Sequence, residues 1–448
     1  MKPDKIAPRW LAITLSAAAT GLAVVYLSHQ GMGYQLWAVL ALCVINACLM
    51  VWVARDGAFS GLSLRQVLVT ASVLGLMALF AQPLLEDDHF RYLWDGYLTA
   101  TTAQPYARAP AFYFGNEAVA SVMQSVLSGI NNPEVPTIYG PVLQAIFALC
   151  YAVSPAALWP FKLVLLSGLL LVLLLLHRAG VAPRWLLLFV LHPLVFKESA
   201  LTAHPDLLIG LALLAAVLAW RGGQHGWAAG LASIAVAVKF SAVAALPFFC
   251  IDRQGRFSLR GSAAMALTLC LVYTPVWLSV AGGEGRALAV LGEQWTFNPL
   301  LFKIARELLS DSAARVMVLL MFAAVWMGVF WSWIQQLRAV DRGQFTLPAD
   351  SLPLPPVVAV ITALLLLSPV VNPWYWLWIL PLAMLSFSLI AWVAATVSLL
   401  AYAHVAESVW RGSSIVSFAV PLWATLAQIL IISVSMGCVC VVKARCKR

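Results

Sequence analysis

Charged residues are scarce in this sequence of 448 residues. Asp, Glu, Lys and Arg make up 10% of it, whereas hydrophobic residues make up 62%. A soluble globular chain carries about 25% charged residues, so this chain cannot cover its surface with groups that water solvates. The scarcity excludes a soluble globular protein and requires a surface that faces lipid. The length accommodates roughly a dozen membrane helices of about 20 residues each.

The chain also lacks the cysteine pattern of a disulfide-stabilised or metal-binding protein. Its eight cysteines lie in apolar segments or in the terminal tail, and none falls in a loop that we place outside the membrane. We therefore expect no disulfide and no metal cluster. The net charge of +9 comes from basic residues scattered between apolar segments. That distribution is typical of cytoplasmic loops and does not indicate nucleic-acid binding.

Hydropathy and charge together predict the path of the chain through the membrane. Basic residues before the first apolar segment and in 443–448 place both termini in the cytoplasm. The apolar run from Trp10 to Leu27 is long enough to be a retained helix, although it resembles a signal peptide. Spans are expected near residues 10–28, 35–54, 66–85, 160–177, 185–201, 206–221, 261–281, 312–334, 355–371, 376–390, 391–405 and 416–441. A short pair near 226–239 and 242–251 is expected to form a hairpin with Lys239 at its outer turn. The predicted fold is an all-α polytopic membrane protein, a single domain over residues 1–448 with about 12–13 transmembrane helices.

The predicted spans leave three long connections: an external loop at 86–137, a second external loop at 282–311, and a cytoplasmic linker at 338–354. Part of the second loop is expected to be an amphipathic helix in the membrane interface. The short apolar segment 138–154 either crosses the membrane fully, or is re-entrant or lies in the membrane interface. We favour the second, because a crossing would place Arg178 and Arg184 outside, against the positive-inside rule.

The first external loop opens on a dense group of charges. Six of the 18 acidic residues fall within 86–137, and three carboxylates stand in a row at Glu86, Asp87 and Asp88. A carboxylate that removes a proton from a hydroxyl acts as a general base, and a neighbouring carboxylate raises the pKa of one member of a pair. Asp87 and Asp88 are therefore candidate catalytic residues. The alternative interpretation is a solvated helix end.

A cation, two large aromatic residues and a fourth carboxylate follow directly, at Arg91, Tyr92, Trp94 and Asp95. We expect Tyr92, Trp94 and Asp95 to bind substrate. Arg91 either holds a phosphate or pairs with Asp87 or Asp95. Tyr139, where the loop turns back to the membrane, is a further candidate for substrate binding, with an ordinary turn as the alternative.

Other polar groups are expected at the same outer face although they come from distant segments. Ionisable residues within membrane segments are costly and usually functional. His204 and Asp206 are candidates for binding a sugar or a leaving phosphate. The alternative for Asp206 is a capping residue at the start of a helix. Lys239 lies in an apolar run, where it either reaches the interface or meets an anion. Trp374 and Tyr375 belong either to a binding site or to the aromatic belt.

The stretch from Asp87 to Gly96, continued by 104–110, resembles a bacterial family of polytopic GT-C glycosyltransferases, the polyprenol-phosphate-mannose-dependent mannosyltransferases. The family pattern has an acidic pair, then Arg-Tyr-Leu-Trp-Asp-Gly, then an Asn-Pro-Tyr element in which Gln104 here replaces the Asn. Later elements of the family are similar to Tyr139-Gly140-Pro141, His204-Pro205-Asp206, Lys239 and Pro373-Trp374-Tyr375, in that order.

The resemblance implies a GT-C-like bundle whose external loops form the active site. It implies an inverting transfer of a sugar, mannose by family weight, from a polyprenyl-phosphate donor at the outer face of the bacterial inner membrane. The acceptor is a lipid, a polysaccharide or a protein. Asp87 would be the base, with Asp88 as the alternate. The donor would be held by Arg91, His204, Asp206, Lys239, Trp374 and Tyr375. No cofactor is implied, although such dense carboxylates suit Mg²⁺ or Mn²⁺.

Two other classes of function compete with an enzyme. A transporter or lipid flippase would use the same charges as substrate or proton sites. Against it, the polar groups gather at one face rather than at the midplane, and the sequence has no evident paired repeat. A structural membrane scaffold is weaker still, because it has no need of Lys239 or of the acidic stretch.

The predicted topology has a direct test. A reporter fused after Ala339 is expected to be cytoplasmic, and one inserted near Asn131 is expected to be external, because the first lies beside basic residues and the second in the acidic loop. Protease or thiol accessibility of the two reporters in intact cells measures the side. An external signal at Ala339 would contradict the topology.

Overall fold

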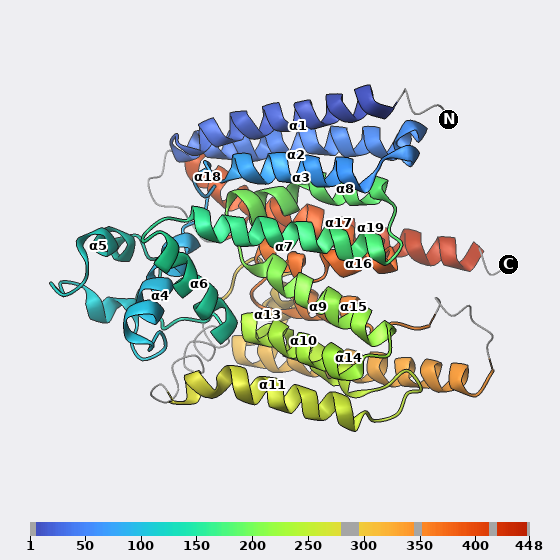
Figure 1. The fold of residues 1–448 in the computed structure, drawn as a ribbon. Coiled ribbons are helices and arrows are strands. Elements are labelled where there is room, and N and C mark those ends of the chain that lie inside the picture. The colour runs from blue at the N-terminus through green and yellow to red at the C-terminus, as the bar shows by residue number, and fades with distance from the viewer. Residues whose placement is uncertain (1–5, 279–294, 345–351, 412–418, 446–448) are drawn as a thin grey trace.

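The chain folds as a bundle of helices (Figure 1). The computed structural model describes residues 6–278, 295–344, 352–411 and 419–445. Within these ranges the only β-type pairing consists of two isolated bridges, between Ile251 and Phe257 and between Phe297 and Val370. The predicted class, an all-α polytopic membrane protein, is confirmed.

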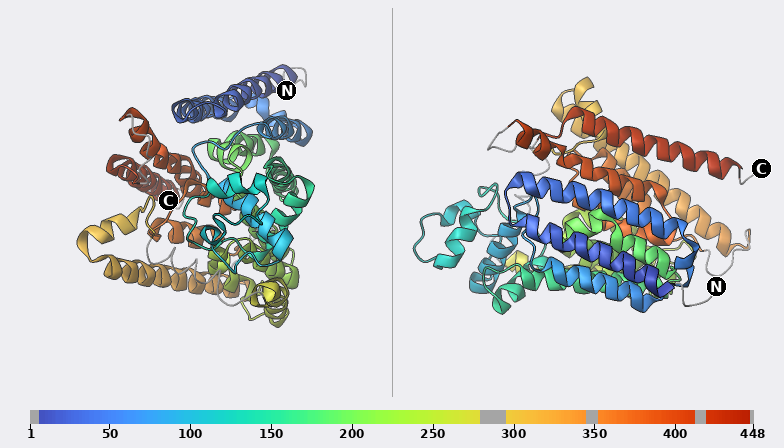
Figure 2. Two further views of the ribbon diagram at one scale, coloured as in Figure 1. Left: turned by 90° about the vertical axis from the view of Figure 1, so that its left-hand side faces the viewer. Right: turned by 90° about the horizontal axis from the view of Figure 1, so that it is seen from above.

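The helices of the bundle run side by side, and both termini lie at the same end (Figures 1 and 2). At the opposite end the helices α4 (Asp88–Thr102), α5 (Ser121–Ser128) and α6 (Pro141–Val153) gather into a separate group. We call residues 88–153 the α4–α6 cap. The cap contains most of the predicted external loop, together with the short apolar segment after it.

The other elements of the bundle are, in chain order, α1 (Ile6–Ser28), α2 (Met32–Arg55), η2 (Gly57–Gly61), α3 (Leu64–Ala78), η3 (Pro110–Tyr113), α7 (Trp159–Arg178), α8 (Pro183–Leu191), η4 (Val195–Leu201), α9 (Asp206–Arg221), α10 (His225–Val238), η5 (Phe240–Cys250), α11 (Leu259–Leu278), α13 (Leu301–Leu308), α14 (Asp311–Asp341), α15 (Val357–Leu367), η7 (Pro373–Trp378), α16 (Leu380–Ser386), α17 (Leu389–Val397), η8 (Ser398–Tyr402), α18 (Ala403–Trp410) and α19 (Leu422–Arg445). Element η4 is a π-helix, whereas η2, η3, η5, η7 and η8 are 3₁₀-helices.

Five helical segments of the described chain are long and apolar enough to cross a membrane. They are α1, α2, α7, α14 and the segment Leu389–Trp410. The pair η4 and α9 would add a sixth span, but it is bent by 111° at the break between its halves. Seven further apolar helices of 10–17 residues, α6 among them, are too short to pass the same test. A helix of 13 residues, as α6 is, extends only about 20 Å.

The predicted spans agree with the helices in position more often than in length. The span predicted at 206–221 is α9, and the span predicted at 226–239 is α10 to within one residue. The span predicted at 66–85 is too long, because α3 ends at Ala78. Lys162 of α7 donates to the carbonyl oxygens of Ala78 and Ala81 at 2.8 and 2.7 Å. A buried lysine therefore satisfies the carbonyls where α3 ends, a usual role for a cation at a helix C-terminus.

The span predicted at 185–201 is interrupted. Helix α8 ends at Leu191, and His192 and Pro193 follow before η4 begins. A proline has no backbone N–H and does not continue an α-helix without strain. The chain resumes as a π-helix in which the N–H of Thr202 donates to the carbonyl of Lys197 at 2.9 Å, five residues back. This irregular backbone lies inside the bundle, where protein rather than lipid surrounds it.

The span predicted at 376–390 is also broken. Its residues divide between η7, which ends at Trp378, and the seven-residue helix α16. In the second predicted external loop, residues 279–294 lie outside the described residues. The described part contains α13, which buries Phe302 and Ala305 and exposes Ile304, as an amphipathic helix requires. In the predicted linker, 338–341 belongs to α14 and 345–351 lies outside the described residues.

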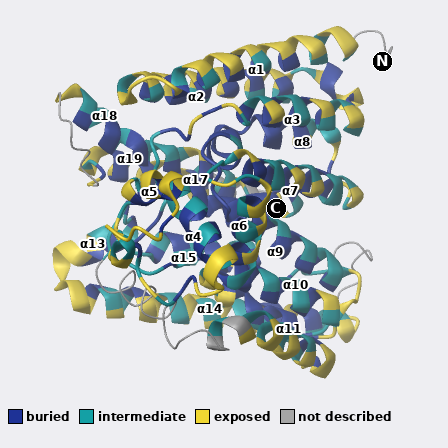
Figure 3. Ribbon diagram, turned by 60° about the vertical axis from the view of Figure 1, so that its left-hand side comes forward, coloured by how far each residue is buried: buried dark blue, intermediate teal, exposed yellow. Residues whose placement is uncertain are grey.

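Burial follows the expectation for a protein in lipid. Exposed residues line the outer faces of α1 and α11, and buried residues fill the centre of the bundle (Figure 3). Leu15 and Leu22 of α1 and Leu267 and Leu271 of α11 are among the exposed residues. The main core cluster draws on α1 to α3, α7 to α10 and η7. The cap has its own small core around Trp94, Leu98 and Met123.

Close backbone approach attaches the cap to its neighbours. A Cβ atom added to Gly96 of α4 would lie 2.5 Å from the carbonyl oxygen of Phe147 in α6. One added to Gly140 would lie 2.2 Å from the carbonyl oxygen of Ala237 at the end of α10. Neither contact has room for a methyl group, so these glycines fix the distance between α4 and α6 and between the cap and α10.

Replacing Gly96 by alanine is therefore expected to lower the stability of the protein. The added methyl group would push α4 from α6, and such overpacking costs about 1–3 kcal/mol. Thermal unfolding in detergent measures the effect. Gly328→Ala in α14 is the matched control, because a Cβ there meets nothing within 4 Å. An equal loss of stability in both variants would contradict this account.

Candidate active site

The three consecutive carboxylates of the acidic stretch contact residues of the cap and of the bundle. The side-chain amide of Asn131 donates to Asp87 and, at 3.4 Å, to Asp88. Oδ2 of Asp88 also lies 3.9 Å from Nδ1 of His204. Glu86 lies near Lys197 and Tyr402 in the bundle. The stretch is thus a junction between the cap and two distant parts of the bundle, and not a solvated helix end.

The local sequence explains why the carboxylates diverge. Leu85 has a positive φ of 64° and precedes the turn into α4, whose capping position is Asp87 and whose first residue is Asp88. From Asp88 onward, side chains four residues apart share one face of the helix. Asp88 and Tyr92 accordingly both face His204.

Asp88 has the electrostatic character of a general base. Burial, followed by the negative charge of Asp87, raises the pKa of the Asp88 carboxyl to about 6. Burial also raises the pKa of Asp87, while the hydrogen bond from Asn131 lowers it. A quarter of the Asp88 side chain remains exposed, at 25%. Asp88 can therefore meet an incoming group and exchange a proton near neutral pH.

His204 lies at the centre of a buried cluster that also contains Asp206 and Lys239. It is fully buried, and its Nδ1 hydrogen-bonds the hydroxyl of Tyr92 at 3.1 Å. Its ring stacks on Trp374 with 3.7 Å between ring centroids and an angle of 8° between the planes. The sequence predicted both His204 and Trp374 as donor-binding residues from segments 170 positions apart, and the structure brings them into contact.

Asp206 and Lys239 form a buried ion pair. The Nζ of Lys239 lies 3.2 Å from Oδ1 of Asp206, which also accepts a hydrogen bond from Nε1 of Trp378. The Lys239 ammonium lies 4.1 Å from the ring centroid of Tyr375, in the geometry of a cation–π contact. The anion that Lys239 meets in this structure is therefore a carboxylate of the chain itself, and the hydrogen-bond donors to that carboxylate come from the end of α10 and from η7.

Tyr139 and Arg91 are two further residues that were predicted from the sequence. The buried ring of Tyr139 contacts Tyr92 edge to face at 5.3 Å, beside the cluster. Arg91 donates through Nη2 to the carbonyl of Val135, and its buried Nη1 has no hydrogen-bond partner. Arg91 thus ties α4 to the end of the loop and keeps one donor available.

Trp94 and Asp95 do not face the cluster. Trp94 is fully buried in the cap, where its ring packs against Tyr97 and Tyr113. Asp95 accepts hydrogen bonds from Thr137 and Gln144, the latter at 3.1 Å. Both side chains hold the cap together in this structure, so we do not carry forward their predicted role in substrate binding.

Lys197, Glu198 and Tyr402 were not predicted from the sequence as site residues. Lys197 and Glu198 are adjacent in η4 and form an ion pair at 3.1 Å with both side chains fully buried. Tyr402 donates to Oε1 of Glu198 at 2.9 Å. Two opposite charges inside the predicted span 185–201 were a visible signal, because charged residues are rare in membrane segments. Nothing in the sequence indicated Tyr402.

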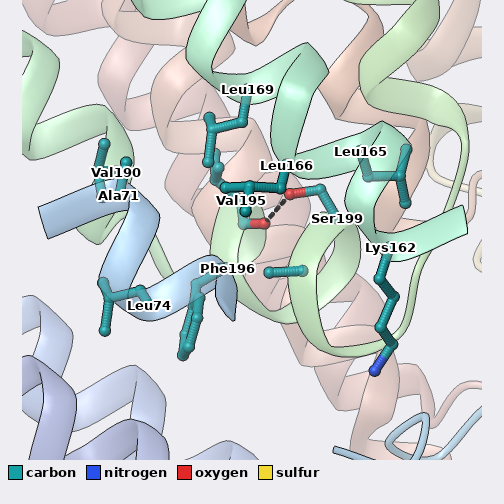
Figure 4. A pocket seen from close by; sticks show the side chains of 12 residues that line it. Ala71, Leu74, Lys162, Leu165, Leu166, Leu169, Val190, Val195, Phe196 and Ser199 are labelled. Atoms are coloured by element: carbon teal, nitrogen blue, oxygen red, sulfur yellow. Dashed lines mark hydrogen bonds between the residues drawn. The ribbon is translucent and has the colours of Figure 1, made fainter. Parts of the chain in front are cut away.

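A cleft between α3, α7 and η4 is not part of this site. Its lining is mostly aliphatic, and Ser199 donates within η4 to the carbonyl of Val195 (Figure 4). Lys162, at the edge of the cleft, donates to the carbonyl oxygen of Ala78 at the end of α3. Among the described residues, no group of three or more His, Cys, Asp or Glu has the arrangement of a metal site.

The sequence matches the model of a known protein family. The model of a family described as "Alpha-(1->6)-mannopyranosyltransferase, N-terminal domain" matches residues 8–252, more than half of the chain. The matched part includes Asp88, His204, Asp206 and Lys239, whereas Trp374 lies beyond it. No curated protein and no solved structure matches the chain.

Removal of one member of the Lys239–Asp206 pair is expected to destabilise the protein. Lys239→Met leaves a buried carboxylate without its counter-charge, which costs about 3–5 kcal/mol. Combining it with Asp206→Asn is expected to recover part of the loss, since the amide oxygen still accepts from Trp378. Thermal unfolding of the two single variants and the double variant in detergent measures the coupling. Losses that simply add would show that the two side chains are not paired.

Proposed function

We propose a reaction on one premise, which is that this chain belongs to the alpha-(1->6)-mannopyranosyltransferase family. It is therefore a glycosyltransferase with several membrane helices, and the transporter and flippase interpretation is not favoured. The description of the family names mannose as the transferred sugar. The donor, the acceptor, the stereochemical course and the general base are the parts that we propose here.

We propose that the donor is polyprenyl-phosphate-mannose. The cluster of His204, Asp206 and Lys239 lies between membrane helices on one side and the α4–α6 cap on the other. A donor with a lipid tail would keep the tail among the apolar helices and bring its phosphate to Lys239. The free Nη1 of Arg91 offers a second cationic donor from the side of the cap. Aromatic side chains suit the faces of a sugar ring, and Trp374 and Tyr375 lie on the bundle side of the cluster.

Asp88 is the general base of the proposed reaction. The observation that carries this assignment is its position, partly exposed and directed at the buried cluster 3.9 Å from His204. Asn131 donates to both carboxylates, at 3.4 Å to Asp88 and more closely to Asp87, which the family resemblance favoured. The charge of Asp87 supports the reaction indirectly by raising the pKa of Asp88, after the larger effect of burial.

The chemistry is a single displacement at the anomeric carbon. Asp88 takes the proton of the acceptor hydroxyl, whose oxygen forms a bond to C1 of mannose. The bond between C1 and the phosphate oxygen breaks, and Lys239 and Arg91 stabilise the charge on the leaving phosphate. A single displacement inverts the configuration at C1. The acceptor is a lipid, a polysaccharide or a protein.

We propose that the cap faces the outside of the bacterial inner membrane, with both termini in the cytoplasm. Both termini lie at the end of the bundle opposite the cap (Figure 1), so this orientation agrees with the basic residues near them. The chain acts as one catalytic domain in this proposal.

Sugar transfer by the purified protein in detergent tests the proposal. The assay contains polyprenyl-phosphate-mannose and a membrane-lipid extract, with EDTA as a separate condition. Asp88→Asn is expected to lose transfer by at least about 100-fold, because a positioned base contributes 10²–10⁴-fold, while it retains donor binding. Transfer by Asp88→Asn at the wild-type rate would remove Asp88 from this role.

The pH dependence separates the two carboxylates. A base must be deprotonated, so wild-type transfer is expected to fall as the pH drops through about 6, the pKa of Asp88. Asp87→Asn removes a charge that raises this pKa, so its activity is expected to persist and its acid limb to move to lower pH. If Asp87 is the base, the same substitution abolishes transfer at every pH.

A further inference from the structure

The buried pair Lys197–Glu198 has no part in the reaction proposed above. Both side chains are fully buried at 0% exposure, on a π-helix between two apolar segments. A π-helical turn is often found at functional sites, and ionisable residues inside a membrane protein are costly to keep. The pair therefore calls for a role that its position can supply.

Glu198 is held from two sides. Nζ of Lys197 lies 3.1 Å from Oε2 of Glu198, and the hydroxyl of Tyr402 donates to Oε1 at 2.9 Å. Lys197 also donates to the Tyr402 hydroxyl and lies 3.8 Å from the centroid of its ring. Lys197 places a positive charge beside the Glu198 carboxyl group, and Tyr402 fixes where that group points.

The Glu198 carboxyl group also faces His204. Oε2 lies 3.6 Å from Nε2 of His204, a buried nitrogen that has no hydrogen-bond partner. The backbone N–H of His204 already donates to the carbonyl of Glu198 at 2.8 Å. Trp374 restrains the face of the ring, and Tyr92 contacts Nδ1. A buried polar atom left unpaired costs about 1–3 kcal/mol, so a small closing movement of this pair is favourable.

We propose that Glu198 is a positioning residue for His204, with Lys197 and Tyr402 holding it in place. In the reacting enzyme the Nε2–H of His204 donates to Glu198, which directs Nδ1 at Asp88. The ring of His204 stays neutral between Lys197 and Lys239. When Asp88 has taken the proton of the acceptor, its O–H donates to Nδ1 of that ring. This inference rests on the proposed function.

A double-variant experiment tests whether Glu198 acts through His204. Initial rates of mannose transfer give kcat and KM for the donor in Glu198→Gln, His204→Gln and the double variant. Glu198→Gln keeps the shape of the side chain and removes its charge. Residues that orient a working group typically change activity by 10–100-fold, so kcat is expected to fall by about that factor while donor KM stays within about 3-fold of wild type. In the His204→Gln background the second substitution is expected to have no further effect, because interacting residues are not additive.

Two further variants complete the design. Tyr402→Phe removes one hydrogen bond to Glu198 and is expected to lower kcat by a smaller factor, again only when His204 is present. It also carries the test if Glu198→Gln does not fold. Glu407→Gln is the control, because Glu407 forms an exposed pair with Arg411 on α18, and it is expected to match wild type.

The outcomes are distinguishable. Losses from Glu198→Gln or Tyr402→Phe that are as large without His204 as with it would overturn the inference and leave the proposed function intact. A rise in donor KM at unchanged kcat would assign Glu198 to donor binding and would also overturn it. Absence of mannose transfer by the wild-type protein would contradict the proposed function itself, and the inference would fall with it.

Discussion

A positive charge inside an apolar bundle is costly unless hydrogen-bond acceptors or a negative charge compensate it, and the pair Lys239–Asp206 meets this condition where one helix ends and another begins. Lys239 follows the last residue of α10, and Asp206 is the first residue of α9. Trp378 donates to the same carboxylate from η7, so three segments converge on one buried charge. The bend of 111° between η4 and α9 brings His204 to the same place. The site exists because these charges cannot be left unpaired in the membrane.

Much of the architecture could be predicted, because hydropathy and charge report the solvent that each segment meets. The bounds of α9 were predicted to the residue, and His204 and Trp374, which the sequence assigned to the same site, are in contact in the structure. Hydropathy reports composition and not backbone hydrogen bonding. It therefore missed the interruption after Leu191 and the early end of α3, which depends on a lysine more than 80 residues later.

The site could be predicted only in part, for reasons of geometry. Trp94 follows Asp88 by six residues, which turns it about 120° away around the axis of α4, and it packs into the cap. Asp95 shares a face with Asp88 but lies two turns away, about 10 Å along the helix. Glu198 was visible as a charge in an apolar run, whereas its partner Tyr402 is 204 residues away. Only the folded chain could connect those two.

Because η4 is a π-helix, the position of His204 depends more on the length of the segment 195–201 than on its composition. A π-turn is in effect an α-helix that contains one extra residue. Loss of one residue from 195–201 would restore regular α-helical hydrogen bonds and would turn every later side chain by about 100° about the axis. His204 would then leave Trp374 and Tyr92, although each apolar residue around it was unchanged. Across this stretch, exchanges between similar apolar residues preserve the fold, whereas a single insertion or deletion dismantles the site.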